Sequence, residues 1–201
     1  MNMRMKMKIE KIALGLVLML MVTGCQEVKN VVETPIETTV ESPVGEIPET
    51  KETKKTFSGI DGDFTLEATN LWLEDVSLHV DSSLSLVNQT YNSYYILLKD
   101  EKESLPKTIE LGYYAELAGE ATLRDLKDGV VTKMEDVEFN GIKGKRFYLK
   151  GMIEEVSITY EFLVFENDTH FFQEIIWSSS ENIEKNLDYY DDILQSFKLV
   201  K

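Results

Sequence analysis

Cysteine and histidine are nearly absent from this chain, which has one cysteine and two histidines in 201 residues. A single cysteine excludes a disulfide framework or a thiolate zinc site in the body of the protein. The histidines, His79 and His170, are far apart in the sequence, and no Gly-x-Ser-x-Gly motif surrounds any serine. We therefore expect no metal, no cofactor and no catalytic residues, and we expect that the protein is not an enzyme.

The N-terminal apolar run is too short to span a bilayer. It extends over 12–22 and has 11 residues, about half of the roughly 20 that a transmembrane helix needs. Residues 1–11 before it are basic, and the small residues Thr23 and Gly24 follow it. This order is typical of a secretory signal peptide, which we assign to residues 1–24.

The only cysteine, Cys25, directly follows this segment. The stretch "VTGC" resembles the lipobox of bacterial lipoproteins, in which an aliphatic residue and two small residues precede the cysteine. The resemblance implies that Cys25 receives a diacylglyceryl thioether and that cleavage between Gly24 and Cys25 makes it the first mature residue. Two or three acyl chains anchor a protein durably to a membrane. We therefore predict a protein held by an N-terminal lipid on the extracytoplasmic face of the bacterial cell membrane.

Residues 25–56 lack aromatic side chains and are rich in Glu, Thr, Val and Pro. They contain three of the four prolines, at positions 35, 43 and 48. Such a segment cannot bury enough apolar surface to offset the entropy of ordering it. It is predicted to be a disordered tether that holds the body away from the membrane.

The body, residues 57–201, has few basic residues for its number of acidic ones. It contains 28 Asp and Glu against 13 Lys and Arg. A domain this acidic is repelled by phosphate backbones and by anionic headgroups, so nucleic acid is not an expected partner. The excess of negative charge keeps the body soluble, or it attracts a basic partner or cations.

The body alternates strand and helix signals. Apolar and polar residues alternate in strand-like stretches, and Asn140–Gly141 between apolar residues predicts a type I′ hairpin turn. The expected strands are 64–68, 84–89, 93–99, 131–139, 142–151, 154–166 and 169–179.

Two helices are expected. The first follows Pro106, with Thr108 as its N-cap and Gly129 after its last turn. The second begins with a capping box in which Ser178 is paired with Glu181. Its apolar face is expected to comprise Ile183, Leu187, Tyr190, Leu194 and Phe197.

This order of elements is similar to that of PsbP-like proteins. The residues that carry the resemblance are "FTLEA", "LGYYAEL", "VEFNGIKGKRFYL" and the closing "YDDILQSFK". The resemblance covers about residues 57–201 and implies an α+β domain in which two helices cover an antiparallel sheet as an α/β/α sandwich. PsbP-like proteins include non-catalytic adaptors and photosystem accessory proteins.

Aromatic residues offer the best candidates for a binding surface. Trp72, Tyr94, Tyr113 and Tyr148 could be exposed and suited to binding, or they could pack at the edges of the core. The acidic residues of "DGD", Asp61 and Asp63, form only a weak candidate for a cation site, since the rest of a calcium loop is absent. Acidic residues also gather before the hairpin, at 135, 136 and 138, and in the last helix, at 188, 191 and 192.

The function that these features favour is that of a non-catalytic binding or accessory module at the cell envelope, with an envelope protein as partner. One alternative is a lipoprotein that binds a small ligand or a cation and serves a transporter. Another is a carboxylate-dependent hydrolase. Convergent carboxylates near His170 would favour the hydrolase, and a cleft at Trp72 would favour the ligand-binding protein.

Overall fold

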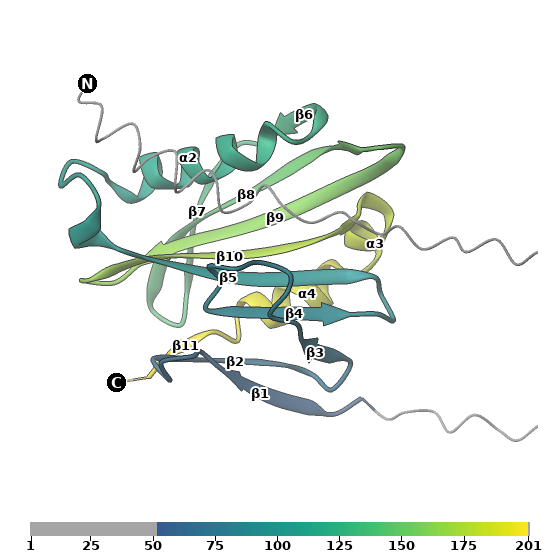
Figure 1. Cartoon of the computed structure of the whole chain (residues 1–201), viewed down its shortest axis with the longest axis horizontal. Coiled ribbons are helices and arrows are strands. Elements are labelled where there is room, and N and C mark those ends of the chain that lie inside the picture. Colours follow the sequence, from purple (N-terminus) through teal and green to yellow (C-terminus); the bar gives the residue numbers. More distant parts are fainter. Residues whose placement is uncertain (1–51, 201) are drawn as a thin grey trace, which may run out of the picture.

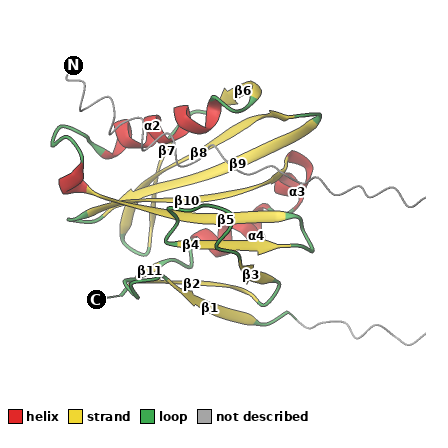
Figure 2. Cartoon of the chain, in the orientation of Figure 1, coloured by secondary structure: helices red, strands yellow, loops and turns green. Residues whose placement is uncertain are grey.

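The computed structural model describes residues 52–200 (Figures 1 and 2). The predicted signal peptide, Cys25 and residues 26–51 of the tether lie outside the described residues. The strands are β1 (Lys54–Ser58), β2 (Phe64–Thr69), β3 (Trp72–Glu74), β4 (Leu84–Asn88), β5 (Ser93–Glu101), β6 (Lys127–Val131), β7 (Glu135–Phe139), β8 (Ile142–Ile153), β9 (Val156–Glu166), β10 (His170–Ser179) and β11 (Lys198–Leu199). The helices are η1 (Lys102–Ser104), α2 (Leu111–Leu123), α3 (Ser180–Lys185) and α4 (Leu187–Leu194).

The centre of the molecule is a large antiparallel sheet with strand order β3-β4-β5-β10-β9-β8-β6, in which β7 also pairs with β8. Successive side chains of a strand point to opposite faces, so each strand contributes to two cores. Leu97 packs on one face with α4, and its neighbours Ile96 and Leu98 pack on the other with α2. Helices therefore cover both faces (Figure 2), which confirms the predicted α+β sandwich.

The predicted hairpin at Asn140–Gly141 is confirmed. Both residues have positive φ, 49° and 76°, as a type I′ turn requires. The turn joins β7 to β8 with Phe139 opposite Ile142. Glycine is needed at 141 because a side chain there would be strained even though the space around it is open.

The predicted ends of the first helix are wrong. The N-cap of α2 is Glu110, whose side chain makes no capping bond, and not Thr108. Gly129 does not end the helix, because α2 stops at Leu123 and Gly129 lies within β6. An added Cβ at Gly129 would lie 2.7 Å from the side chain of Leu123, so this glycine allows β6 to pass close to the end of the helix.

The second predicted helix is interrupted and begins one residue later. Ser179, not Ser178, is the N-cap of α3, and its Oγ accepts a hydrogen bond from the backbone N–H of Asn182. Asn186 separates α3 from α4. Leu187 is consequently 41% exposed, although it was expected on the buried face.

A second, three-stranded sheet was not predicted. Its order is β1-β2-β11, so the first and last strands of the body flank β2. It lies at the bottom of Figure 1, on the α4 side of the large sheet, where Phe57, Phe64 and Leu66 join the core. Because β1 begins at Lys54, the folded body starts three residues before the expected boundary at residue 57.

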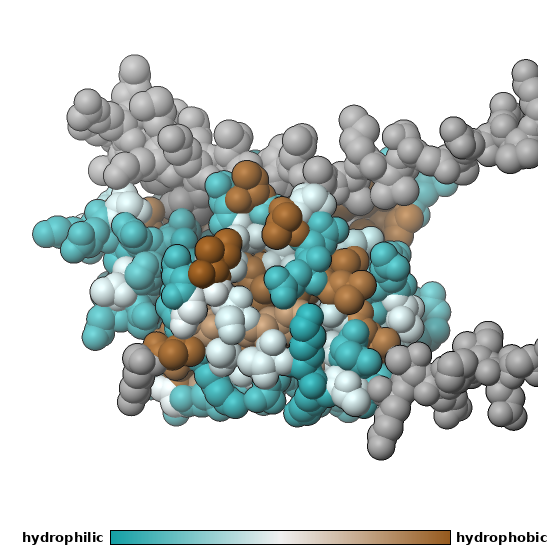
Figure 3. Space-filling view, turned by 60° about the horizontal axis from the view of Figure 1, so that its bottom comes forward, coloured by the Kyte–Doolittle hydropathy of each residue, from teal (hydrophilic) through white to brown (hydrophobic). Residues whose placement is uncertain are grey.

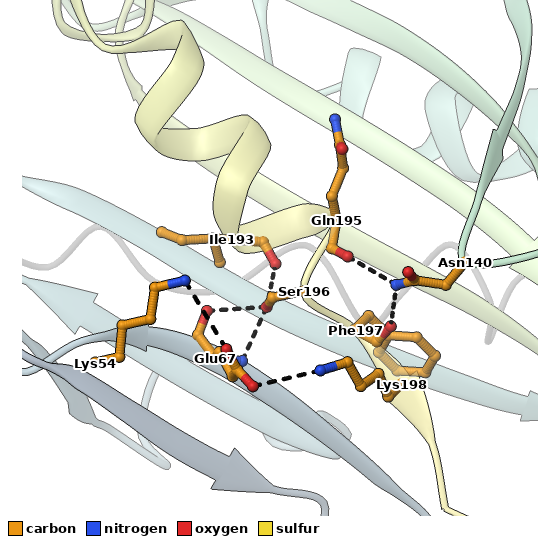
Figure 4. A network of polar contacts seen from close by, with 8 residues as sticks. All are labelled: Lys54, Glu67, Asn140, Ile193, Gln195, Ser196, Phe197 and Lys198. Atoms are coloured by element: carbon orange, nitrogen blue, oxygen red, sulfur yellow. Dashed lines mark hydrogen bonds and ion pairs between the residues drawn. The ribbon is translucent and has the colours of Figure 1, made fainter.

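Ser196, just after α4, connects this small sheet to the rest of the molecule (Figure 4). Its Oγ accepts a hydrogen bond from the backbone N–H of Glu67 in β2 at 2.9 Å and lies 2.6 Å from the carbonyl oxygen of Ile193. Nearby, the Asn140 side chain donates to the carbonyl oxygens of Gln195 at 2.8 Å and Phe197 at 3.0 Å. The segment after α4 thus holds together β2 and the β7–β8 hairpin.

Candidate functional site

The four aromatic residues predicted to form a binding surface do not form one. Trp72 is fully buried on the α4 face, where its indole Nε1 donates to the hydroxyl of Tyr189 at 2.8 Å, so it is not part of an exposed surface. Tyr113 is half exposed on α2. Tyr148 is partly buried on the α4 face of the sheet, and Tyr94 lies on the opposite face.

A partly buried charged cluster lies between the large sheet and α4. We call Arg146 and Tyr148 of β8, Glu161 of β9 and Asp191 of α4 the Arg146 cluster. The Arg146 guanidinium pairs with both carboxylates, and its Nη2 donates to the Tyr148 hydroxyl at 2.7 Å. Glu161 is fully buried, and its Oε2 has no hydrogen-bond partner among the described residues.

The environment shifts the proton affinities of this cluster. Burial raises the pKa of Glu161, and the nearby Arg146 offsets this only in part. Burial and then the charge of Glu161 raise the pKa of Tyr148 to about 12. Burial alone would lower the pKa of Arg146. The two carboxylates outweigh this effect, so the pKa lies above its usual value. Arg146 therefore stays charged and is neutralised from within the protein.

Two cavities meet at Arg146. One, of about 220 Å³, lies between the β7–β8 hairpin and α4, with Phe139 and Leu163 on its apolar side and Arg146 and Asp191 on its polar side. The other, of about 360 Å³, lies where β8 stops pairing with β7 and starts pairing with β6. Arg146 and Val137 line both cavities. Such a mixed lining can hold a small molecule, with Arg146 as the one basic residue that both cavities share.

Glu174, on β10, is the second fully buried carboxyl group. Its Oε1 accepts a hydrogen bond from the Tyr95 hydroxyl at 2.8 Å, and its Oε2 has no partner among the described residues. Burial raises the pKa of Glu174 well above its usual value, and the Tyr95 hydrogen bond only partly opposes this. Neither Glu174 nor Glu161 lines the two cavities, so neither carboxyl group is placed to act on a molecule bound there.

The other candidates from the sequence are occupied by contacts within the protein. Lys99 fills the position between the "DGD" carboxylates, with its Nζ 3.0 Å from Asp61 and 2.7 Å from Asp63, so this pair already holds a cation. His170 Nδ1 lies 2.7 Å from the Thr169 hydroxyl, and His79 is buried in the β3–β4 loop. Within 52–200, no group of three or more His, Cys, Asp or Glu residues could hold a metal ion.

Neither cavity at Arg146 is the pocket of carboxylates and His170 that would favour a hydrolase, although Glu101 lies opposite His170 in the register of β5 and β10. Asp191 pairs with Arg146 on the α4 face, and the Asp136 carboxylate pairs with Lys145 at 2.5 Å. His170 lines neither cavity.

One face of the molecule carries both hydrophobic and hydrophilic residues (Figure 3). Figure 3, which brings the bottom of Figure 1 forward, shows hydrophobic residues interspersed with hydrophilic ones on this face. Among the described residues, no helix is both long enough and apolar enough to cross a membrane.

Comparison with known proteins identifies the class of fold. Cyanobacterial PsbP (CyanoP) from Synechocystis sp. PCC 6803 matches with a TM-score of 0.56 and 10% identity, over 79% of this chain and 100% of that one. LpqN of Mycobacterium tuberculosis, described as involved in cell envelope biogenesis, matches with a TM-score of 0.52 and 9% identity, over 75% of this chain and 92% of that one. No protein-family model matches the chain, and no curated protein matches it in sequence. The chain has a PsbP-like fold, as its motifs predicted.

Proposed function

We propose that this chain is a lipid-anchored, extracytoplasmic accessory protein that binds another component of the cell envelope and catalyses no reaction. The observation that carries the proposal is the position of Cys25. It is the only cysteine, it follows Gly24, and it stands at the end of a short apolar run with a basic start. A thiol at that position serves as the acceptor for lipid.

The body supports a binding role. The charged groups of the Arg146 cluster and of the Lys99–Asp63 pair form ion pairs with one another within the fold. Groups that are paired in this way stabilise and orient side chains, whereas a general acid or base needs access to a substrate. LpqN, whose fold is similar, is described as involved in cell envelope biogenesis, and this agrees with the proposed location.

The anchor is tested by replacing Cys25 with Ser. We expect the variant protein to leave the membrane fraction and to appear in the soluble extracytoplasmic fraction. The control is the double variant C25S/S42C, which restores a cysteine 17 residues downstream, away from the apolar run. It should also be released. Unchanged membrane association of C25S would refute lipid anchoring.

A second candidate function is the binding of a small ligand, which the two cavities at Arg146 favour. It is tested by titrating isotope-labelled protein with a panel of small carboxylates and small amines. Binding would move the NMR signals of Phe139 and Leu163 together, and replacement of Arg146 by Met would abolish the response. If no compound moves these two signals, this candidate fails.

A further inference from the structure

One face of the large sheet carries an apolar row that crosses five strands. The register pairs Leu73 of β3 with Val87 of β4, Val87 with Tyr94 of β5, Tyr94 with Trp177 of β10, and Trp177 with Tyr160 of β9. Residues paired in this way point to the same face. We call these five residues the apolar stripe, and only one of them, Tyr94, was among the residues expected at a binding surface.

The stripe is exposed at Leu73 and partly exposed along the rest of its length, where Trp177 and Tyr160 also pack against the core under α2. Leu73 is 52% exposed, and the other four side chains are partly exposed. The stripe lies on the α2 face, next to the rows that α2 and Leu78 of the β3–β4 loop cover. With neighbouring strands about 4.8 Å apart, five strands make it roughly 19 Å long. Six residues of an extended peptide have about that length.

The aromatic part of the stripe is rigid. Trp177 stacks on Tyr94 with ring centroids 5.2 Å apart and on Tyr160 with centroids 5.7 Å apart. The rings cover one another's flat faces, the faces on which a sugar would stack. Trp177 and Tyr160 also carry an indole N–H and a phenolic hydroxyl. Such groups can donate to the carbonyl oxygens of a peptide.

The net charge of the body indicates which kind of peptide could bind at the apolar stripe. The body is strongly acidic, and Asp125 is close enough to Tyr160 to raise its pKa, after burial, to about 12. A second copy of the body is repelled by the same charge. Residues 26–51 contain six acidic and two basic residues, so the chain's own tether is also repelled.

We propose that the apolar stripe is a docking surface for an extended segment of a partner protein that carries apolar side chains flanked by lysine or arginine. The inference rests on the proposed accessory function and adds to it the surface and the kind of partner. Trp177 and Tyr94 are the central contacts, as buried aromatic residues are in other interfaces. The acidic body increases the rate of encounter with the basic segment.

The test uses the full chain in neutral detergent and a fluorescently labelled six-residue peptide of alternating lysine and leucine, with empty micelles as the blank. Fluorescence anisotropy should report binding. Replacement of Leu73 by Lys should weaken it by about tenfold or more, since it removes an apolar contact and adds a like charge. The matched control is Tyr113→Lys, because Tyr113 is 50% exposed on α2, outside the stripe, and the change in charge is the same.

Four outcomes would overturn the proposal. Equal weakening by Leu73→Lys and Tyr113→Lys would show that overall charge alone attracts the peptide. Equally tight binding of a lysine–serine peptide would show that the stripe is not used. Self-association of the protein that Leu73→Lys abolishes would make a second copy the occupant. A photo-crosslink from benzoylphenylalanine at position 94 to residues 26–51 would make the occupant the tether.

Failure of this inference is distinguishable from failure of the proposed location. Both lysine variants keep Cys25, so their membrane association should equal that of the unmodified chain. If C25S stays in the membrane while the peptide still binds at the stripe, the lipid anchor is refuted and the docking surface stands.

Discussion

Glu174 is a carboxylic acid in a place where a carboxylate cannot be hydrated. It is fully buried on a central strand, and its one hydrogen bond comes from the Tyr95 hydroxyl. Burial raises its pKa well above the usual 4.5, and the charge of the other buried carboxyl group, Glu161, raises it further. In the folded protein Glu174 is therefore protonated at pH values where the unfolded chain has released the proton.

The sign of the pH dependence follows from this difference. Below pH 4.5, Glu174 is protonated in both the folded and the unfolded state, so its proton affinity does not change the free energy of unfolding. As pH rises towards the raised folded-state pKa, the unfolded state is increasingly favoured. Glu174→Gln should therefore be more stable than the unmodified chain at pH 7 to 8, and the advantage should shrink on going to pH 4. Urea unfolding at several pH values measures it.

The control for Glu174→Gln is Glu181→Gln. Glu181 is exposed and bonded to Lys185, which lowers its pKa, so its stabilising pair is lost as pH falls. Removing it cannot reproduce a gain that grows with pH. A constant difference between Glu174→Gln and the unmodified chain from pH 4 to pH 8 would contradict the assigned protonation.

The sequence contained a signal for these buried carboxyl groups. Glu161 in "TYEFLVF" and Glu174 in "FFQEIIW" interrupt apolar runs of long strands, where burial is expected on both faces. The partners were not predictable in the same way. Arg146 and Asp191 meet Glu161 only after β8, β9 and α4 pack together, and spacing along the chain carries no information on that contact.

At the scale of elements, the β7–β8 hairpin has a second role that its turn motif does not reveal. Asn140 was predicted from its tolerance of positive φ. Its side-chain amide also donates to two carbonyl oxygens of the segment after α4 (Figure 4). The turn residue is therefore also a tertiary contact across the α4 face.

Asn140→Asp separates these roles. Aspartate tolerates the same backbone conformation, but it replaces the amide donor by a carboxylate that faces two carbonyl oxygens. We expect a loss of about 1–3 kcal/mol in the free energy of unfolding, measured in urea at neutral pH. Asn92→Asp is the control, since Asn92 also has positive φ but its Oδ1 accepts from the Tyr94 hydroxyl, which aspartate can still do. Equal losses in the two variants would show that only the turn conformation matters.

Elements with a strong periodic pattern were predicted better than elements that depend on a partner. The long strands β8, β9 and β10 alternate or are continuously apolar, and they were recognised. β1 has one buried residue, and β11 has two residues in all. Both are strands because β2 supplies their hydrogen bonds, and no local pattern identifies them.

At the scale of the whole molecule, the body consists of two cores that share one sheet. The α2 core contains Phe147 and Phe162, and the α4 core includes the small sheet. Ser196 forms a polar link between that small sheet and the segment after α4. The small sheet is therefore attached by its apolar face and by a few polar contacts. Besides Ser196, the Thr69 hydroxyl lies 2.9 Å from the Tyr189 hydroxyl, and Lys99 pairs with Asp61 and Asp63 of the β1–β2 loop.

Ser196→Ala should loosen one part of the molecule only. The partly buried N–H of Glu67 loses its acceptor, and hydrogen exchange of the β1 and β2 amides should become faster while β9 and β10 stay protected. Thr132→Ala is the matched control, since Thr132 Oγ1 accepts from the backbone N–H of Tyr148 at 2.9 Å on the far side of the large sheet. Uniformly faster exchange in Ser196→Ala would show that the body opens as one unit.

The edge position of β1 determines how the body responds to mechanical force. Any tension transmitted along the chain from residues before Lys54 reaches β1 first, and β1 pairs only with β2. Its five residue pairs can separate one after another, starting at Lys54 and Thr69, while the strands that carry the apolar stripe belong to the other sheet. The first strand can thus yield under tension and lengthen the chain that precedes the body, and the large sheet keeps its shape.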